Sequence, residues 1–217
     1  METPSLGRVR VRRESGWRIE RYPQTVAALD ADSVEARQVT LTHALDIAIR
    51  DGLDAVTLNS VRESTGLSEV GFPYHDREEL MLALLDVVLA RTLNAEREIA
   101  AGRRERLELG DMLAAEMEGL RRQAPVVELI FTFYFSRADQ LYRSRIGEAL
   151  NTYRRAFESA LSDVELRRGM TATAVSSIVI AFLQGAAVQI IRDPANFVPD
   201  EALAAVRELL PGAGDDR

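Results

Sequence analysis

From residue 33 onward, apolar side chains recur every three or four positions with little interruption. In an α-helix this spacing gathers them on one face, whereas a half-buried strand would alternate apolar and polar side chains. Glycine and proline break the pattern at intervals, and no internal repeat is visible. The pattern therefore predicts an all-α chain of about nine helices, with no strand after residue 33.

Capping residues and helix breakers predict where these helices end. Ser33 and Thr57 fit N-cap positions, and Gly52 and Gly66 fit the ends of the first two helices. We expect helices over residues 35–51, 57–65, 76–101, 111–123, 125–137, 139–163, 171–192 and 200–210, with a short element at 68–72.

Composition excludes several classes of site. A hydrophobic content of 47% suits a globular protein with a sizeable core, and the absence of cysteine excludes disulfides and thiolate metal sites. The first 14 residues lack the apolar run of a secretory signal, so we expect a cytoplasmic location. Nucleophile motifs, phosphate-cradling glycine loops and metal-ligand sets are not evident, which disfavours an enzyme.

Charge is unevenly distributed along the chain. The net charge is −7, but residues 8–21 hold six arginines and two glutamates, whereas residues 33–80 hold four arginines and nine acids. Attraction to phosphates should therefore concentrate in the N-terminal arm. The arm alternates arginine with valine on the way to Gly16, which is typical of a hairpin, and a flexible tail is the alternative.

Residues 171–191 contain no charged side chain and are long enough, as a helix, to span a bilayer. They include six Thr, Ser or Gln side chains, and nothing else in the chain looks membranous. We therefore expect no membrane span here but a buried helix at a subunit interface, where a glycine permits close approach. The predicted interface residues are Val175, Ile178, Val179, Phe182, Gly185 and Gln189.

Two stretches resemble the helix-turn-helix region of the TetR family of one-component transcriptional regulators: ALDIAIRDGLDAVTLNSVRESTGLS (44–68) and REELMLALL (77–85). In that family a helix ends in glycine, Thr or Ser opens the next helix, and a Gly-(Val/Leu)-Ser turn leads into the recognition helix. The stretch IVIAFLQGAAVQIIRDP (178–194) is similar to the family's dimer-forming helix. The residues that fit the first pattern are Gly52, Thr57, Val61, Gly66, Leu67 and Ser68.

The resemblance implies a domain plan and a function. It implies a basic arm (residues 1–32), a three-helix helix-turn-helix domain (33–80) and a helical effector-binding and dimerisation domain (81–217). The implied function is that of a transcriptional repressor, without a cofactor. As a homodimer it would bind operator double-stranded DNA and be released by a small-molecule effector.

The segment between the two stretches departs from the family pattern. From Ser68 to Leu80 it is about two residues shorter than is usual in the family. A helix opened by Ser68 would meet Pro73, which lacks an N–H and costs about 3 kcal/mol inside a helix. Gly71 would weaken that helix by roughly another 1 kcal/mol. We therefore expect a recognition element of one turn at 68–72, followed by an irregular link.

This shortened segment offers few side chains that read bases, because Arg, Lys, Asn and Gln are the usual readers. Glu69 could accept a hydrogen bond from a cytosine amino group, but it would face phosphates unfavourably. The arginine arm could enter a neighbouring groove. The candidate DNA-binding residues are Thr57, Ser68, Glu69, Gly71, Tyr74, His75 and Arg77, with Arg8, Arg10, Arg12 and Arg13 of the arm.

A metal site formed by His75 with Asp76, Glu78 and Glu79 is a weaker alternative. The other histidine, His43, lies far away in the sequence. Acidic residues also commonly begin helices, where they complement the helix dipole. We therefore expect no metal.

The stretch VVELIFTFYFSRADQLY (126–142) is rich in aromatic residues that cannot all share one helix face. Some should enter the core, and others should line a cavity or meet a partner. Ligand pockets combine apolar walls with a few polar groups. The candidate pocket residues are Glu116, Thr132, Tyr134, Tyr153 and Gln184, for each of which an ordinary core or surface role is the alternative.

A second function also fits the sequence. The proline, the contraction and the acidic balance of residues 33–80 favour a ligand-binding or protein-interaction module on the same scaffold, with weakened or lost DNA reading.

Overall fold

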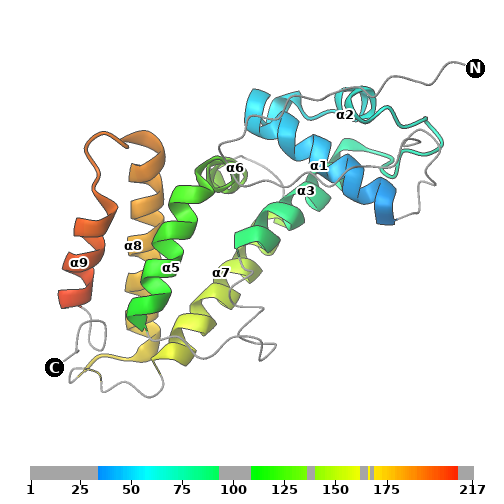
Figure 1. Cartoon of the computed structure of the whole chain (residues 1–217). Coiled ribbons are helices and arrows are strands. Elements are labelled where there is room, and N and C mark those ends of the chain that lie inside the picture. Colours follow the sequence, from blue (N-terminus) through cyan, green and yellow to red (C-terminus); the bar gives the residue numbers. More distant parts are fainter. Residues whose placement is uncertain (1–33, 93–108, 136–139, 162–165, 167–168, 210–217) are drawn as a thin grey trace, which may run out of the picture.

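The computed structural model describes residues 34–92, 109–135, 140–161, 166 and 169–209. Within them every regular element is helical, which confirms the predicted all-α fold (Figure 1). The arginine arm, with the expected hairpin, lies outside these residues. The elements are α1 (Val34–Asp51), the 3-10 helix η2 (Leu53–Ala55), α2 (Leu58–Thr65), α3 (Arg77–Thr92), α5 (Leu109–Arg122), α6 (Ala124–Phe135), α7 (Gln140–Ala160), α8 (Ala172–Arg192) and α9 (Pro199–Leu209).

Local capping explains several of the helix ends. Gly52 and Gly66 follow α1 and α2 with φ angles of 89° and 71°, a region that glycine enters without steric cost. The Thr57 hydroxyl accepts a hydrogen bond from the Ser60 N–H in a capping box. The Thr171 hydroxyl caps α8 by accepting from the Ala174 N–H, without the reciprocal bond of a capping box. These helix ends lie close to the predicted ones because the bonds that set them span only a few residues.

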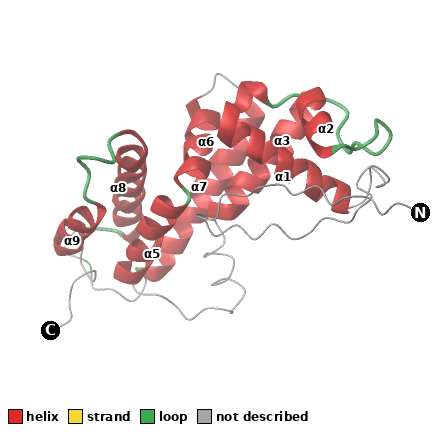
Figure 2. Cartoon of the chain, turned by 45° about the horizontal axis from the view of Figure 1, so that its top comes forward, coloured by secondary structure: helices red, strands yellow, loops and turns green. Residues whose placement is uncertain are grey.

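The helices form two groups joined by α6. In Figure 1, α1, α2 and α3 gather at one end of the molecule, and α5, α8 and α9 lie side by side at the other. α6 packs against α1 and α3 in the first group and against α5 and α8 in the second. Figure 2 shows that the link between α2 and α3 is loop, at the end of the molecule away from α8 and α9.

The first hydrophobic core does not stop at the expected domain boundary. It unites buried residues of α1, α2 and α3 with Val126, Leu129 and Phe133 of α6 and Ile146 of α7. The boundary expected between residues 80 and 81 falls inside α3, where Leu80 is fully buried. Because α6 and α7 contribute side chains to this core, a shift of either helix would change the packing beneath the helix-turn-helix region.

Among the described residues, α8 is the one helix that is long and apolar enough to cross a membrane, with a mean hydropathy of 2.0. Length and composition are its only membrane-like features. It packs against α5, α6 and α7, and Val175, Val179 and Leu183 enter the second core with α5, α7 and α9. Core helices of soluble folds share this composition, so α8 is weak evidence for a membrane span.

Candidate functional site

A side-chain hydrogen bond joins α2 to α1. The Nδ1 atom of His43 on α1 lies 2.7 Å from the Ser64 hydroxyl on α2. Burial lowers the pKa of His43, although Asp46 opposes this shift. The imidazole is therefore favoured in its neutral form, and it acts here as a polar contact between two helices.

The segment after Gly66 starts like a helix but does not continue as one. The Gly71 N–H donates to both the hydroxyl and the carbonyl oxygen of Ser68, at 3.0 and 3.1 Å, as in the first turn of a capped helix. Pro73 then lacks the N–H that a helix would donate to Glu69, and it disfavours a helical Phe72. The structure therefore has a single turn at 68–71 followed by an irregular link into α3, as the position of Pro73 predicted.

The residues after this turn belong to the core. Phe72 and Tyr74 are 8% and 5% exposed, and their rings meet edge to face with centroids 6.3 Å apart. Burial raises the pKa of Tyr74 to about 12. Tyr74 was predicted to contact DNA, but its ring is packed beneath the surface. Gly71 is also buried, and its N–H is already used by Ser68.

The start of α3 is fastened to the loop that precedes α2. Arg77 donates from Nε to the Val56 carbonyl at 2.8 Å and from Nη2 to the Leu53 carbonyl at 2.9 Å. Asp76 accepts from the Glu79 N–H at 2.8 Å, which confirms the expected cap. Arg77 therefore acts first as a brace between α3 and η2, with its remaining N–H groups free for other contacts.

Asp76 and Glu79, the acidic residues near His75 whose bonds are described, accept hydrogen bonds from the backbone at the start of α3. The Glu79 carboxylate accepts a hydrogen bond from the His75 backbone N–H at 3.0 Å. In the described part of the chain, no group of three or more His, Asp or Glu side chains is arranged to hold a metal ion.

The exposed surface of the link is small. Ser68, Glu69, His75 and Asp76 are exposed, as is Thr57 at the start of α2. Val70 stands at the tip of the turn and is 88% exposed. Val70 was not among the predicted contacts, although it is the one apolar residue between Ser68 and Gly71.

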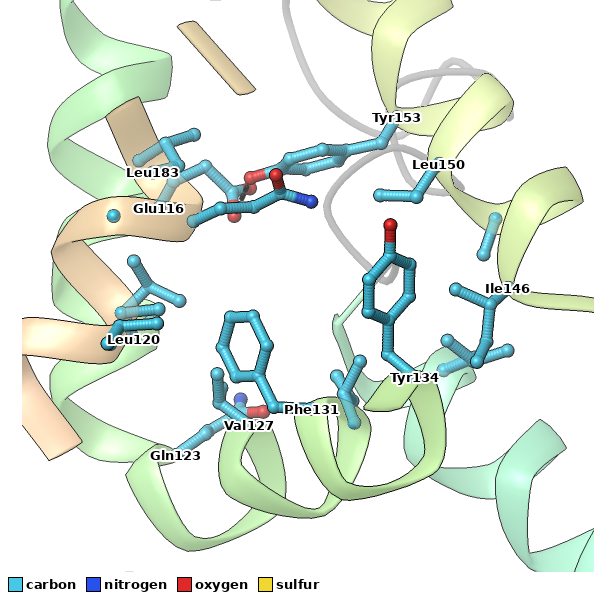
Figure 3. Close-up of a pocket in the computed structure, with 18 of the residues that line it drawn as sticks. Glu116, Leu120, Gln123, Val127, Phe131, Tyr134, Ile146, Leu150, Tyr153 and Leu183 are labelled. Carbon is cyan, nitrogen blue, oxygen red and sulfur yellow. Dashed lines mark hydrogen bonds between the residues drawn. The ribbon is translucent and has the colours of Figure 1, made fainter. Parts of the chain in front are cut away.

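A cavity of about 560 Å³ lies among α3, α5, α6, α7 and α8. Four of the five predicted pocket residues line it: Glu116, Tyr134, Tyr153 and Gln184. The fifth, Thr132, is exposed and donates to the Glu128 carbonyl of its own helix at 2.9 Å. Figure 3 shows that several of these side chains converge on a common space.

The aromatic residues of α6 divide between the core and the cavity, as their number on one helix predicted. Phe133 is 2% exposed and meets Tyr142 edge to face in the first core. Phe131, Tyr134 and Phe135 line the cavity instead. Phe131 and Phe135 were not among the predicted pocket residues, and their helical phase relative to Phe133 was the available signal.

One of the two lining carboxylates, Glu116, is bonded to a neighbouring helix. The Tyr153 hydroxyl donates to Oε2 of Glu116 at 2.6 Å, between helices α7 and α5 (Figure 3). Burial raises the pKa of Glu116, and the bond from Tyr153 opposes that shift. The group is thus polar, oriented and mostly removed from water.

The predicted interface residues of α8 divide between two faces. Val175 and Val179 are fully buried in the chain's own second core and so cannot meet a partner, which corrects their assignment. Phe182 is partly buried against the same core. Gly185 and Gln189 are exposed, and Ile178 is 52% exposed.

The exposed face of α8 carries a continuous apolar stripe. Ile178, Ala181, Gly185 and Val188 are spaced by three or four residues and are all exposed. Gly185 and Val188 also line the cavity, so this apolar stripe borders the cavity.

Comparison with known proteins bears on the fold. No protein-family model matches the sequence, and no curated protein does. GusR from Salmonella enterica matches 82% of this chain and 97% of its own, with a TM-score of 0.62 at 15% identity. A transcriptional regulator of the TetR/AcrR family from Thermobifida fusca matches over 83% and 98%, with a TM-score of 0.55 at 17% identity.

A further similar structure is NalD from Pseudomonas aeruginosa, described as the secondary repressor of the MexAB-OprM multidrug efflux pump. It matches 82% of this chain and 94% of its own, with a TM-score of 0.57 at 18% identity. At such low identity the similarity concerns the arrangement of helices. The chain has the fold of the TetR-family transcriptional regulators.

Proposed function

We propose that the protein is a transcriptional repressor that binds operator DNA as a homodimer and releases it when a small molecule occupies the cavity. The observation that carries this proposal is the TetR-type fold with a cavity joined to the helix-turn-helix region through α6. The proposal has three parts, which concern DNA, the dimer and the coupling between them.

DNA contact would rest on few groups. Phosphates would be contacted by exposed groups beside the amides that begin α2, namely Thr57, Ser68, His75 and the remaining N–H groups of Arg77. Val70 could touch a thymine methyl group at the tip of the turn. Glu69 repels phosphates unless it accepts from a cytosine amino group. The arm with Arg8, Arg10, Arg12 and Arg13 would therefore supply much of the affinity.

The dimer would form through the α8 stripe. Small and apolar side chains at Ile178, Ala181, Gly185 and Val188 suit the close packing of two identical helices about a twofold axis. Such a dimer must place its two DNA-contacting turns about 34 Å apart to meet successive major grooves.

Coupling would run through α6, which contacts both regions. Val126, Leu129 and Phe133 pack in the first core, whereas Phe131 and Tyr134 line the cavity. A ligand that displaces the cavity face of α6 must also disturb packing under α1 and α3, because packed interiors do not deform smoothly.

A second candidate function is a ligand-binding or protein-interaction module that has weakened or lost DNA reading. The loop at 68–76, with no recognition helix and with Glu69 exposed, favours it. The cavity and the dimer stripe would have the same roles in both cases.

Gel retardation of the DNA upstream of the protein's own gene distinguishes the two functions. The repressor proposal predicts retardation by micromolar protein at low salt and release as salt rises. Replacing Arg8 and Arg10 by Gln should weaken binding, whereas a matched exposed pair on α7, Arg143 and Arg155, should matter little. Absence of retardation at low salt would favour the second function.

Sedimentation tests the dimer separately. Ile178→Glu places a charge in the proposed interface and should shift the protein from dimer to monomer at micromolar concentration. Val34→Glu changes another exposed apolar residue, at the start of α1, and should leave the dimer intact. If the wild-type protein is a monomer at this concentration, the proposed dimer is wrong.

A further inference from the structure

We propose that the cavity binds lipophilic organic cations, whose positive charge lies against Glu116 and the surrounding aromatic rings. The inference deepens the proposed effector site and rests on that proposed function for its biological meaning. Cation binding itself can be measured without DNA.

The charges around the cavity favour a cation. Its charged lining residues are Glu116, Glu118 and Arg122. Arg122 pairs with Glu118, with Nε 3.3 Å from Oε1, and both side chains are more than half exposed. Among the described lining residues, Glu116 therefore has no basic partner, and the group that bonds to it is the neutral Tyr153 hydroxyl.

The aromatic walls favour the same class of ligand. Phe131, Tyr134, Phe135 and Tyr153 all line the cavity, and Figure 3 shows Phe131, Tyr134 and Tyr153 around the space beside Glu116. Phe131 stacks on Phe135 with centroids 6.2 Å apart. The faces of such rings are negative and attract ammonium and phosphonium groups.

Size and polarity exclude other cations and disfavour anions. A cavity of about 560 Å³ suits a drug-sized molecule. A bare metal ion would find two lining carboxylates, of which Glu118 is paired with Arg122, and no described group of three acids or histidines is present. An anionic ligand would face Glu116 in apolar surroundings, where like charges repel most strongly.

Calorimetry with two ions of the same shape and opposite charge tests the proposal. Tetraphenylphosphonium should bind the purified protein without DNA, and tetraphenylborate should bind at least about tenfold more weakly. Glu116→Gln should weaken phosphonium binding by about tenfold or more, whereas Glu116→Asp, which keeps the charge, should retain most of it.

Glu148→Gln is the matched control, because Glu148 is exposed on α7 and does not line the cavity. It removes one charge from an acidic protein and should leave phosphonium affinity unchanged. The thermal midpoint of each variant shows whether it is folded.

Phosphonium binding should also weaken as pH falls through the raised pKa of Glu116, because this probe carries no titrating proton. The other titratable or charged groups lining the cavity are Glu118 and Arg122 on α5, Tyr134 on α6 and Tyr153 on α7, and α8 contributes none. The same decline in Glu116→Gln would assign the effect to another group and count against the proposal.

Equal binding of the two ions, or equal phosphonium affinity in wild type and Glu116→Gln, would overturn the proposal. If the protein binds phosphonium but retards no DNA, the cation site is supported and the repressor function is contradicted. If it retards DNA but binds no phosphonium, the repressor function is supported and the cation site is contradicted.

Discussion

The link between α2 and α3 and the cavity among α3, α5, α6, α7 and α8 are built in opposite ways. At the link, Ser68 and Asp76 bond to backbone three residues away, and Arg77 bonds to carbonyls in the loop that precedes α2. Phe72 and Tyr74 fill the core beneath it. Little surface is left to touch a ligand. In the cavity, side chains from five helices surround a space that no side chain of the described residues fills.

Substitutions should therefore have different effects in the two regions. The link is held by short hydrogen bonds and buried rings, so most substitutions there affect stability before they affect binding. The cavity has free volume, so substitutions such as Glu116→Gln change its chemistry at little structural cost.

Tyr74→Ala, at the link, should have the largest effect on stability. Because the ring is 5% exposed, its loss should lower the free energy of unfolding by about 3–4 kcal/mol, measured by urea denaturation. Tyr74→Phe keeps the ring and should cost less than about 1 kcal/mol, with unchanged DNA affinity. If the Tyr74→Ala protein is stable but binds DNA poorly, Tyr74 contacts DNA and does not serve the core.

Arg77→Ala should have an intermediate effect. It removes two hydrogen bonds to the Val56 and Leu53 carbonyls from a partly exposed brace, so we expect a loss of about 1–2 kcal/mol in the same denaturation experiment. Arg77→Lys cannot reproduce the fork and should recover only part of this loss. Unchanged stability in Arg77→Ala would show that the brace is unimportant in solution.

Glu116→Gln should have the smallest effect on stability, and one that depends on pH. The folded-state pKa is raised above the ordinary value of 4.5, so the stability due to this group is present below that value and declines as pH rises through the raised pKa. Relative to Glu116→Gln, the wild type should therefore become less stable as pH rises from 4.5 to 8.

Thermal melts of both proteins across this range measure the difference. A gap that does not vary with pH would show that Glu116 is not desolvated.

The helix ends near Gly52, Thr57 and Gly66 could be predicted because their bonds connect residues a few positions apart. The failure of the helix after Ser68 was predictable for the same reason, since Pro73 acts on its own backbone. The burial of Tyr74 could not be predicted, because it depends on the packing of α1 and α3 around it.

The site at the other end depended on longer-range contacts. Glu116 and Tyr153 were recognised as pocket candidates, but their hydrogen bond joins residues 37 positions apart and requires the placement of α5 beside α7. The apolar character of α8 was evident, yet periodicity could not tell which side would meet the chain's own core. Val175 and Val179 were therefore assigned to the wrong face.

Backbone chemical shifts of residues 68–76, in the free protein and bound to its upstream DNA, show whether a recognition helix forms. We expect no run of helical Cα shifts there in either state, with Phe72 extended before Pro73. An unbroken helical run from Ser68 through Tyr74 in either state would contradict it.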